Sequence, residues 1–175
     1  VAHWPSSFNI ICKLNIVYDS KEDNWVKHFH HDEFYEIDAK GDMASFFKTC
    51  QLIKDDKSIE DNDLIYFLEN DYKHVPGWWG KILELFSTYK GLDYVSLYDH
   101  KDKYFLPMYD DLVSKVFTTE NHHWRSTPST CGSFVVTKER FLEDFDILST
   151  MSGDHNKWLW LNQNRSRTVI SPIPG

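Results

Sequence analysis

The chain has 175 residues, a mass of 20.8 kDa and a formal net charge of −8 at pH 7, from 19 Lys and Arg against 27 Asp and Glu. This acidic balance argues against a nucleic-acid-binding protein and against a polybasic membrane anchor, because both need clustered cations. Aromatic residues make up 16% of the chain, which excludes a disordered protein, and no apolar run reaches the about 18 residues of a membrane span. We therefore expect a globular protein with no nucleic-acid partner and no integral membrane segment.

Three cysteines, Cys12, Cys50 and Cys131, lie far apart and form no Cys-x-x-Cys pair. This set fits neither a disulfide framework nor a structural zinc site, so we expect reduced thiols and a cytoplasmic location. The chain begins with Val1 and ends at Gly175, directly after a strand-like run. For this reason we expect a fragment of a longer chain.

Strand-like runs alternate with helical patterns through the first half of the chain. The β-rich run at residues 8–17 and the short run at 34–37 predict strands. Apolar residues at helical spacing predict a helix after Gly41 and Asp42, namely Met43, Phe46, Phe47, Cys50 and Ile53. The polar, acidic segment 55–63 predicts a loop.

The buried part of the predicted sheet begins after this loop. Five consecutive apolar residues at 64–68 predict a strand that is covered on both faces. Pro76 opens a helix that closes near Gly91 and carries apolar residues at helical spacing, Trp79, Ile82, Leu83 and Phe86. Residues 92–97 predict another strand. The order strand, helix, strand, helix, strand is typical of a largely parallel α/β sheet.

The second half of the chain is less regular. Residues 99–125 are polar and aromatic, with few periodic stretches. Beyond them the pattern predicts a strand, two helices and a last strand, at 133–136, 138–148, 154–162 and 168–170. We therefore predict the α/β class, with a Rossmann-type, mixed but mostly parallel sheet flanked by helices in a single domain over residues 1–175. That domain would have a regular half at 1–98 and an irregular half at 99–175.

Two carboxylates, Glu69 and Asp71, directly follow the predicted strand at 64–68 and are separated by Asn70. In open α/β sheets, ligands bind beyond the carboxyl ends of the strands. Carboxylate oxygens suit Mg²⁺ or Mn²⁺, and such a cation would neutralise a diphosphate. The spacing therefore predicts a divalent-cation site. A solvated acidic turn that only caps the next helix is the alternative.

A second acidic segment, Gly153-Asp154-His155, stands at the start of the predicted helix at 154–162. Either Asp154 or His155 can accept a proton near neutral pH if it is suitably placed, so either is a candidate general base. His155 is also a candidate metal ligand. The alternative is that Asp154 is only the N-cap of the helix.

Other clusters have simpler alternatives. Arg125 precedes a small-residue loop at 126–133, and its guanidinium could meet a phosphate or a sugar hydroxyl, although this segment could also be a plain loop. His28, His30 and His31 resemble a metal-binding patch, but alternate histidines usually face solvent. The many Trp and Tyr residues suit stacking on sugar rings, yet most such residues belong to cores. The sequence lacks the motifs of P-loop NTPases, dinucleotide dehydrogenases, α/β-hydrolases and zinc proteases.

Taken in order, these segments resemble GT-A fold glycosyltransferases, which use nucleotide sugars. Residues 64–72 look like the strand that ends in the Asp-x-Asp metal motif of that family, with Glu69 in place of the first Asp. Residues 130–134 resemble the loop and strand that approach donor and acceptor. The segment around Asp154 and His155 resembles the acidic motif that supplies the base in inverting members.

The first 50 residues carry a further part of the resemblance. Residues 40–46, which include Gly41, Asp42 and Ser45, look like the segment that opens the helix near the nucleotide. Asp19 matches the position that often contacts the uracil or ribose. In the terms of this family, residues 1–98 would be the nucleotide-sugar-binding half and residues 99–175 the acceptor-side half of a GT-A-like catalytic domain.

The resemblance implies metal-dependent transfer of a sugar from a nucleoside-diphosphate donor, with a UDP-sugar favoured, to the hydroxyl of a glycan or another acceptor. It implies that Asp71 and Glu69 hold Mn²⁺ or Mg²⁺ and that Asn70 and Arg125 help to bind the donor. Asp154 or His155 would be the base of an inverting reaction. Two other functions stay open, a non-catalytic carbohydrate- or partner-binding module and a metal-dependent nucleotide hydrolase or nucleotidyltransferase.

Overall fold

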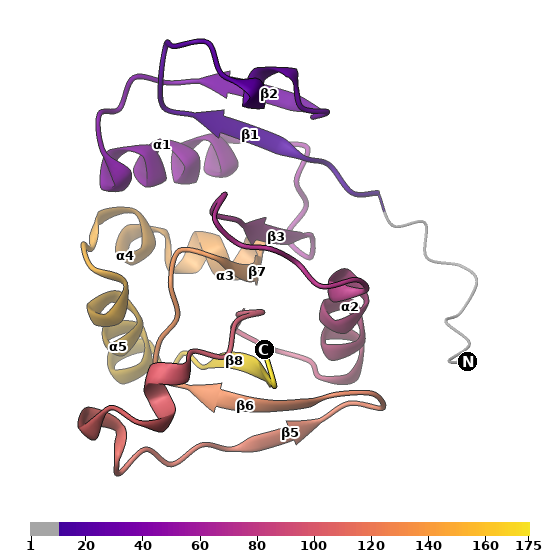
Figure 1. Cartoon of the computed structure of the whole chain (residues 1–175), viewed down its shortest axis with the longest axis vertical. Helices are drawn as coiled ribbons and strands as arrows, with labels where there is room; N and C mark the ends of the chain where they lie inside the picture. Colours follow the sequence, from indigo (N-terminus) through magenta and orange to yellow (C-terminus); the bar gives the residue numbers. More distant parts are fainter. Residues whose placement is uncertain (1–10) are drawn as a thin grey trace. The chain divides into compact units, whose positions relative to one another are not determined.

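The computed structural model describes residues 11–175, which belong to two compact units (Figure 1). The first unit extends to Leu52, and the second runs from Ile53 to Gly175. Residues 8–10, the start of the first predicted strand, lie outside the described residues. No helix in the described part of the chain is long and apolar enough to cross a bilayer. The single domain with halves at 1–98 and 99–175 stays a prediction.

The first unit contains a two-stranded parallel sheet of β1 (Asn15–Tyr18) and β2 (Glu33–Glu36). A short 3₁₀ helix, η1 (Trp25–His28), lies between them in the chain and is capped by the side chain of Asn24, which accepts the N–H of Val26 at 3.2 Å. The helix predicted after Gly41 is confirmed as α1 (Asp42–Asp55). The short strand at 34–37 is confirmed within one residue by β2.

The second unit is built on one mixed sheet. Its strands are β3 (Leu64–Phe67), β4 (Tyr94–Val95), β5 (Val116–Thr118), β6 (His123–Thr127), β7 (Phe134–Thr137) and β8 (Val169–Ile173). Its helices are α2 (Trp78–Thr88), α3 (Lys138–Glu143), α4 (Phe145–Thr150), α5 (Asp154–Arg165) and the 3₁₀ turns η2 (Lys101–Tyr104) and η3 (Pro107–Tyr109). The strands follow the order β3-β7-β4-β8-β6-β5. The mixed α/β class with flanking helices is therefore confirmed.

The prediction of a mostly parallel sheet is wrong. Among the described strands of this sheet, β4 and β8 are the one parallel pair, and β3–β7, β4–β7, β6–β8 and β5–β6 are antiparallel. The alternation of strands and helices does give β3, β4 and β8 a common direction, because β3 and β4 both run opposite to β7. The pattern does not predict that β7, from a later part of the chain, lies between β3 and β4 in the sheet.

The hairpin of β5 and β6 begins within residues 99–125, which we predict to be irregular, and extends to Thr127 in the predicted small-residue loop. Its strands pair in the register Val116↔Arg125 to Thr118↔His123. The aromatic and β-branched residues of the two strands flank the polar turn at 119–122, a hairpin signal that the overall polarity of the region obscures.

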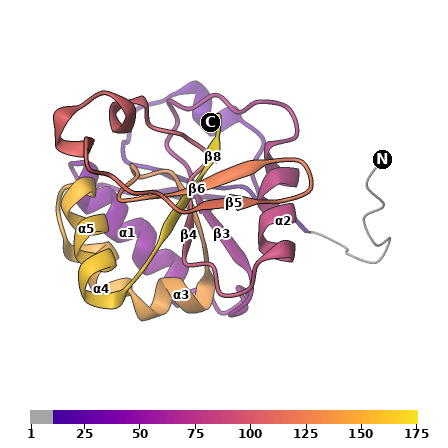
Figure 2. The same cartoon turned by 90° about the horizontal axis from the view of Figure 1, so that it is seen from below.

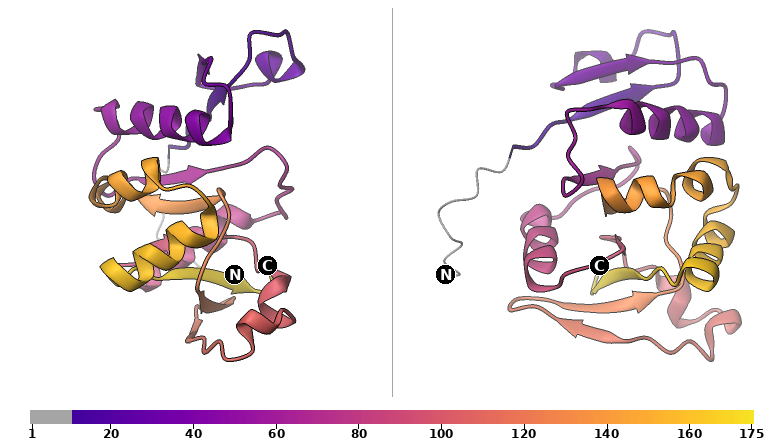
Figure 3. Two further views of the ribbon diagram at one scale, coloured as in Figure 1. Left: turned by 90° about the vertical axis from the view of Figure 1, so that its left-hand side faces the viewer. Right: turned by 180° about the vertical axis from the view of Figure 1, so that it is seen from behind.

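Side chains of the central strands point alternately to the two faces of the sheet, and helices pack on each face (Figure 2 and Figure 3). Val95 and Val135 pack with Ile82 and Leu85 of α2 on one face. On the other face the ring of Phe134 lies 5.0 Å from that of Trp158 in α5. Successive side chains of a strand point to opposite faces, so the apolar run of β7 serves both layers.

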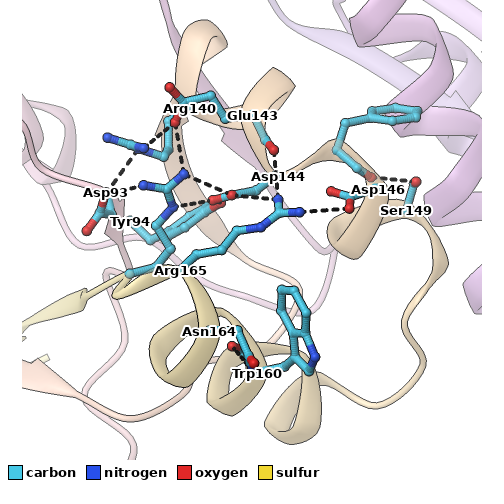
Figure 4. Close-up of polar contacts among 12 residues, drawn as sticks. Asp93, Tyr94, Arg140, Glu143, Asp144, Asp146, Ser149, Trp160, Asn164 and Arg165 are labelled. Carbon is cyan, nitrogen blue, oxygen red and sulfur yellow. Dashed lines mark hydrogen bonds and ion pairs between the residues drawn. The ribbon is translucent and has the colours of Figure 1, made fainter.

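Asp144, which lies between α3 and α4, is a fully buried carboxylate that connects the helices to the sheet (Figure 4). Tyr94 of β4 donates its hydroxyl to Oδ2 at 2.6 Å, and Arg165 at the end of α5 donates Nη1 to Oδ1 at 2.9 Å. Arg167 adds two bonds, from Nε at 2.8 Å and from Nη2 at 3.0 Å. Burial by itself would raise the pKa of Asp144, but the hydrogen bonds from Arg167, Tyr94 and Arg165 hold this pKa below its usual value.

We predict that Asp144→Asn lowers the free energy of unfolding at pH 7 by about 3 kcal/mol, because it removes the charge that pairs with two arginines. A lowered pKa in the folded state means that the carboxylate stabilises the fold fully above its usual pKa of 3.8 and loses this effect as the pH falls through the lower folded value. Urea unfolding of both proteins from pH 7 to pH 2 measures the difference. A difference that stays constant over this range would contradict the prediction.

Candidate functional site

Glu69 lies two residues beyond the end of β3 and is held by the residue that precedes β7. Its backbone N–H donates to the hydroxyl of Ser133 at 3.0 Å, and that hydroxyl donates to Oε2 of Glu69 at 3.3 Å. This contact follows from the antiparallel register, in which Phe67 is paired with Phe134. The end of β3 therefore faces the loop that leads into β7.

The loop approaches Glu69 so closely that a side chain at Gly132 would displace the end of the Glu69 side chain. A Cβ on Gly132 would lie 2.9 Å from both Cδ and Oε1 of Glu69. Next to it, Cys131 accepts a hydrogen bond from the hydroxyl of Tyr72 at 3.0 Å, and Thr130 donates to Ser96 at 2.8 Å. Residues 129–133, which we call the β7 loop, thus connect the ends of β3 and β4.

Three carboxylates share one electrostatic environment at this place. Burial raises the pKa of Glu69 above its usual value, the negative charges of Asp154 and Asp71 raise it further, and hydrogen bonds from Ser133 and Cys131 oppose the change. The two acidic segments that the sequence singled out are therefore close enough to interact, although they lie far apart in the chain. Asn70 lies between Glu69 and Asp71 and is exposed.

Asp154 and His155 open α5 beside the β7 loop. The N-cap of α5 is Gly153, at a φ of 78°, so the interpretation of Asp154 as the N-cap is wrong. The carboxylate of Asp154 lies 3.5 Å from the ammonium of Lys157, which is almost completely buried. Nδ1 of His155 lies 3.3 Å from the hydroxyl of Ser129 and 3.4 Å from that of Tyr109.

Arg125 is bound inside the second unit rather than presented to a ligand. Its Nε and Nη2 both donate to Oδ1 of Asp99, at 3.0 and 2.7 Å, and its guanidinium lies 4.6 Å from the ring centre of Tyr104. The side chain is 7% exposed. A direct contact between Arg125 and a donor phosphate stays a prediction, and it would require this pair to open.

The remaining candidate residues form a separate cluster in the first unit. Asp19 accepts hydrogen bonds from the N–H of Ala39 at 2.7 Å, from the N–H of Gly41 at 3.4 Å and from the hydroxyl of Ser45. The bonds from Ser45 and Ala39 hold the pKa of Asp19 below its usual value. The structure thus brings Asp19, Gly41 and Ser45 together at the start of α1, whose first residue is Asp42. Their role in binding a nucleoside stays a prediction.

The described residues by themselves offer no complete set of ligands for a divalent cation. Among residues 11–175, no group of three or more His, Cys, Asp or Glu side chains could hold a metal ion alone. Glu69 and Asp71 together supply two carboxylates, and Mg²⁺ is usually bound by one or two carboxylates with substrate phosphates and water. The negative charges of Asp154 and Asp71, which add to the effect of burial in raising the pKa of Glu69, would be compensated by a cation. These residues therefore fit a metal held jointly with a phosphate-bearing ligand.

Three residues of this arrangement lie in segments that the sequence singled out, but no sequence pattern indicated a role for them. Tyr72, Ser129 and the hydroxyl of Ser133 all contact residues of the two acidic segments or of the β7 loop. Their residue types are common in loops, so a single sequence carries little signal for them. Comparisons with models of protein families, with curated proteins and with solved structures found no match. Function must therefore be inferred from the geometry of the site.

We predict that Asp154→Asn lowers the pKa of Glu69 toward its usual value of 4.5, because it removes a neighbouring negative charge. Ser133→Ala should change this pKa in the opposite direction, because it removes a hydrogen bond to the carboxylate. Titration of the Glu69 Cδ resonance by ¹³C NMR, assigned with Glu69→Gln, measures both effects. The exposed Glu120, changed to Gln, is the matched control and should leave the titration unaltered.

We predict that Gly132→Ala displaces the carboxylate of Glu69 with little loss of stability, since the atoms that meet the new Cβ end a flexible side chain. The Glu69 Cδ resonance should move while the urea midpoint changes little. Gly80→Ala is the control, because its Cβ would meet nothing within 4 Å, and it should stabilise α2 by up to about 1 kcal/mol. An unchanged Glu69 resonance in Gly132→Ala would contradict the close approach.

Proposed function

We propose that this protein is a metal-dependent glycosyltransferase that moves a sugar from a nucleoside-diphosphate donor to an acceptor hydroxyl. The observation that carries the proposal is the hydrogen bonding of Glu69, just beyond β3, to Ser133 of the β7 loop, with the negative charges of Asp71 and Asp154 near enough to raise the pKa of Glu69. The mixed sheet flanked by helices is compatible with a GT-A-like fold, the family that the order of motifs resembles.

In this proposal, Asp71 and Glu69 hold Mn²⁺ or Mg²⁺ against the donor diphosphate. The cation would supply positive charge to the phosphate oxygens of the leaving group. Ser133 fixes Glu69 through two hydrogen bonds, and Gly132 leaves room for its carboxylate. The acidic net charge of the chain is consistent with a bound cation, rather than Lys or Arg side chains, supplying the positive charge.

Asp154 is the better supported of the two candidate bases. Its side chain is 44% exposed at the start of α5 and its charge acts on Glu69, whereas Nδ1 of His155 lies near the hydroxyls of Ser129 and Tyr109. Asp154 would accept the proton of the acceptor hydroxyl as its oxygen forms a bond to the anomeric carbon and the bond from that carbon to the diphosphate breaks. This is an inverting displacement, and general base catalysis of this kind typically contributes about 10²–10⁴-fold. His155 would position the β7 loop.

Calorimetric titration with UDP-, GDP- and dTDP-sugars, first with Mn²⁺ and then with EDTA, tests the proposal. We expect one donor, a UDP-sugar first, to bind only with the metal, and Asp71→Asn to weaken this binding at least about tenfold. Glu120→Gln removes an exposed carboxylate elsewhere and should have no effect.

The other outcomes of this titration point to other functions. If the folded protein binds no nucleotide sugar, the proposal of a transferase is wrong, and the function becomes that of a glycan- or partner-binding module. Hydrolysis of the nucleotide without any acceptor would instead indicate the hydrolase or nucleotidyltransferase.

A further inference from the structure

A cleft of about 200 Å³ lies beside the carboxylate site in the second unit. It is lined by residues 72–75, by the first turn of α2 and by residues 97–98 after β4. Tyr72 and Ser133 line it as well. Since Ser133 also binds Glu69, the cleft and the carboxylate site share a wall.

One side of the cleft is a compact aromatic cluster of Tyr66, His74 and Trp78. The hydroxyl of Tyr66 and Nε2 of His74 lie 2.8 Å apart, and the ring centres of His74 and Trp78 lie 4.4 Å apart. Burial raises the pKa of Tyr66 to about 12, and burial lowers the pKa of His74, so both rings are uncharged near neutral pH. Such a wall offers an apolar surface on which the C–H face of a sugar ring can pack.

Two of the residues that line the cleft are lysines. Lys73 and Lys81 both line it, and in the described part of the chain neither forms an ion pair with a carboxylate. Lys81 belongs to the first turn of α2, where the helix dipole adds positive potential. In a chain with a net charge of −8, two such cations beside an aromatic wall favour an anionic ligand.

We propose that this cleft binds an acidic saccharide, a sugar that carries a carboxylate or a phosphate, as the acceptor of the transfer. The role as acceptor rests on the glycosyltransferase proposed above. The sugar ring packs on Tyr66, His74 and Trp78, and Lys73 and Lys81 bind its anionic group. The shared wall at Tyr72 and Ser133 then places the saccharide next to Glu69 and its neighbouring carboxylates.

NMR titration of the ¹⁵N-labelled protein tests this site without nucleotide or metal. The probes are glucuronic acid, glucose 6-phosphate, glucose and inorganic phosphate, and the readout is the indole N–H of Trp78. We expect an acidic sugar to shift this resonance and to bind more tightly than glucose or phosphate. The double variant Lys73→Gln/Lys81→Gln should bind it about tenfold more weakly and with less dependence on salt.

Lys90→Gln is the matched control, because Lys90 is exposed and lies beyond the other end of α2. If glucuronic acid binds more tightly, the anionic group of the ligand is a carboxylate. If glucose 6-phosphate binds more tightly, that group is a phosphate ester. Equal binding of glucose and the acidic sugars, equal binding of inorganic phosphate, no shift at Trp78, or an unaffected double variant would each overturn the proposal. Because donor and metal are absent, such a failure would leave the nucleotide-sugar titration to decide the transferase independently.

Discussion

The buried carboxylate of Asp144 is the interaction on which the second unit depends most. A charge without solvent is costly unless it is fully paired, and Asp144 receives hydrogen bonds from Tyr94, Arg165 and Arg167. These partners belong to β4, to the end of α5 and to the segment before β8. The network therefore fixes one end of α5 against the sheet, and the opposite end of this helix carries Asp154.

The candidate site uses negative charge in the opposite way. At Asp144 the arginines compensate the carboxylate, whereas burial and the charges of Asp154 and Asp71 together raise the pKa of Glu69. An ion pair joins Asp154 to the ammonium of Lys157. If the proposed cation binds together with its ligand, it would compensate this negative charge.

The β7 loop gives the site its shape. It contacts Glu69 through Ser133, Tyr72 through Cys131 and His155 through Ser129. Its position follows from the antiparallel pairing of β7 with β3 and β4, which brings the end of β3 and the start of β7 to the same edge. The departure from a parallel sheet is therefore what builds the candidate site and the wall that it shares with the cleft.

The sequence by itself determined the local elements and the two acidic segments. Helical spacing predicted α1 and α2, the apolar run at 64–68 predicted β3, and the carboxylates at Glu69, Asp71 and Asp154 stood out by position. Tertiary structure decided the insertion of β7 between β3 and β4, the approach of Gly132 to Glu69 and the pairing of Arg125 with Asp99. The physical reason is the range of the interactions. Periodicity and capping act over a few residues, so a local pattern in the sequence reports them. Strand order and ion pairing join residues that are distant in the chain, and no local pattern in a single sequence reports them.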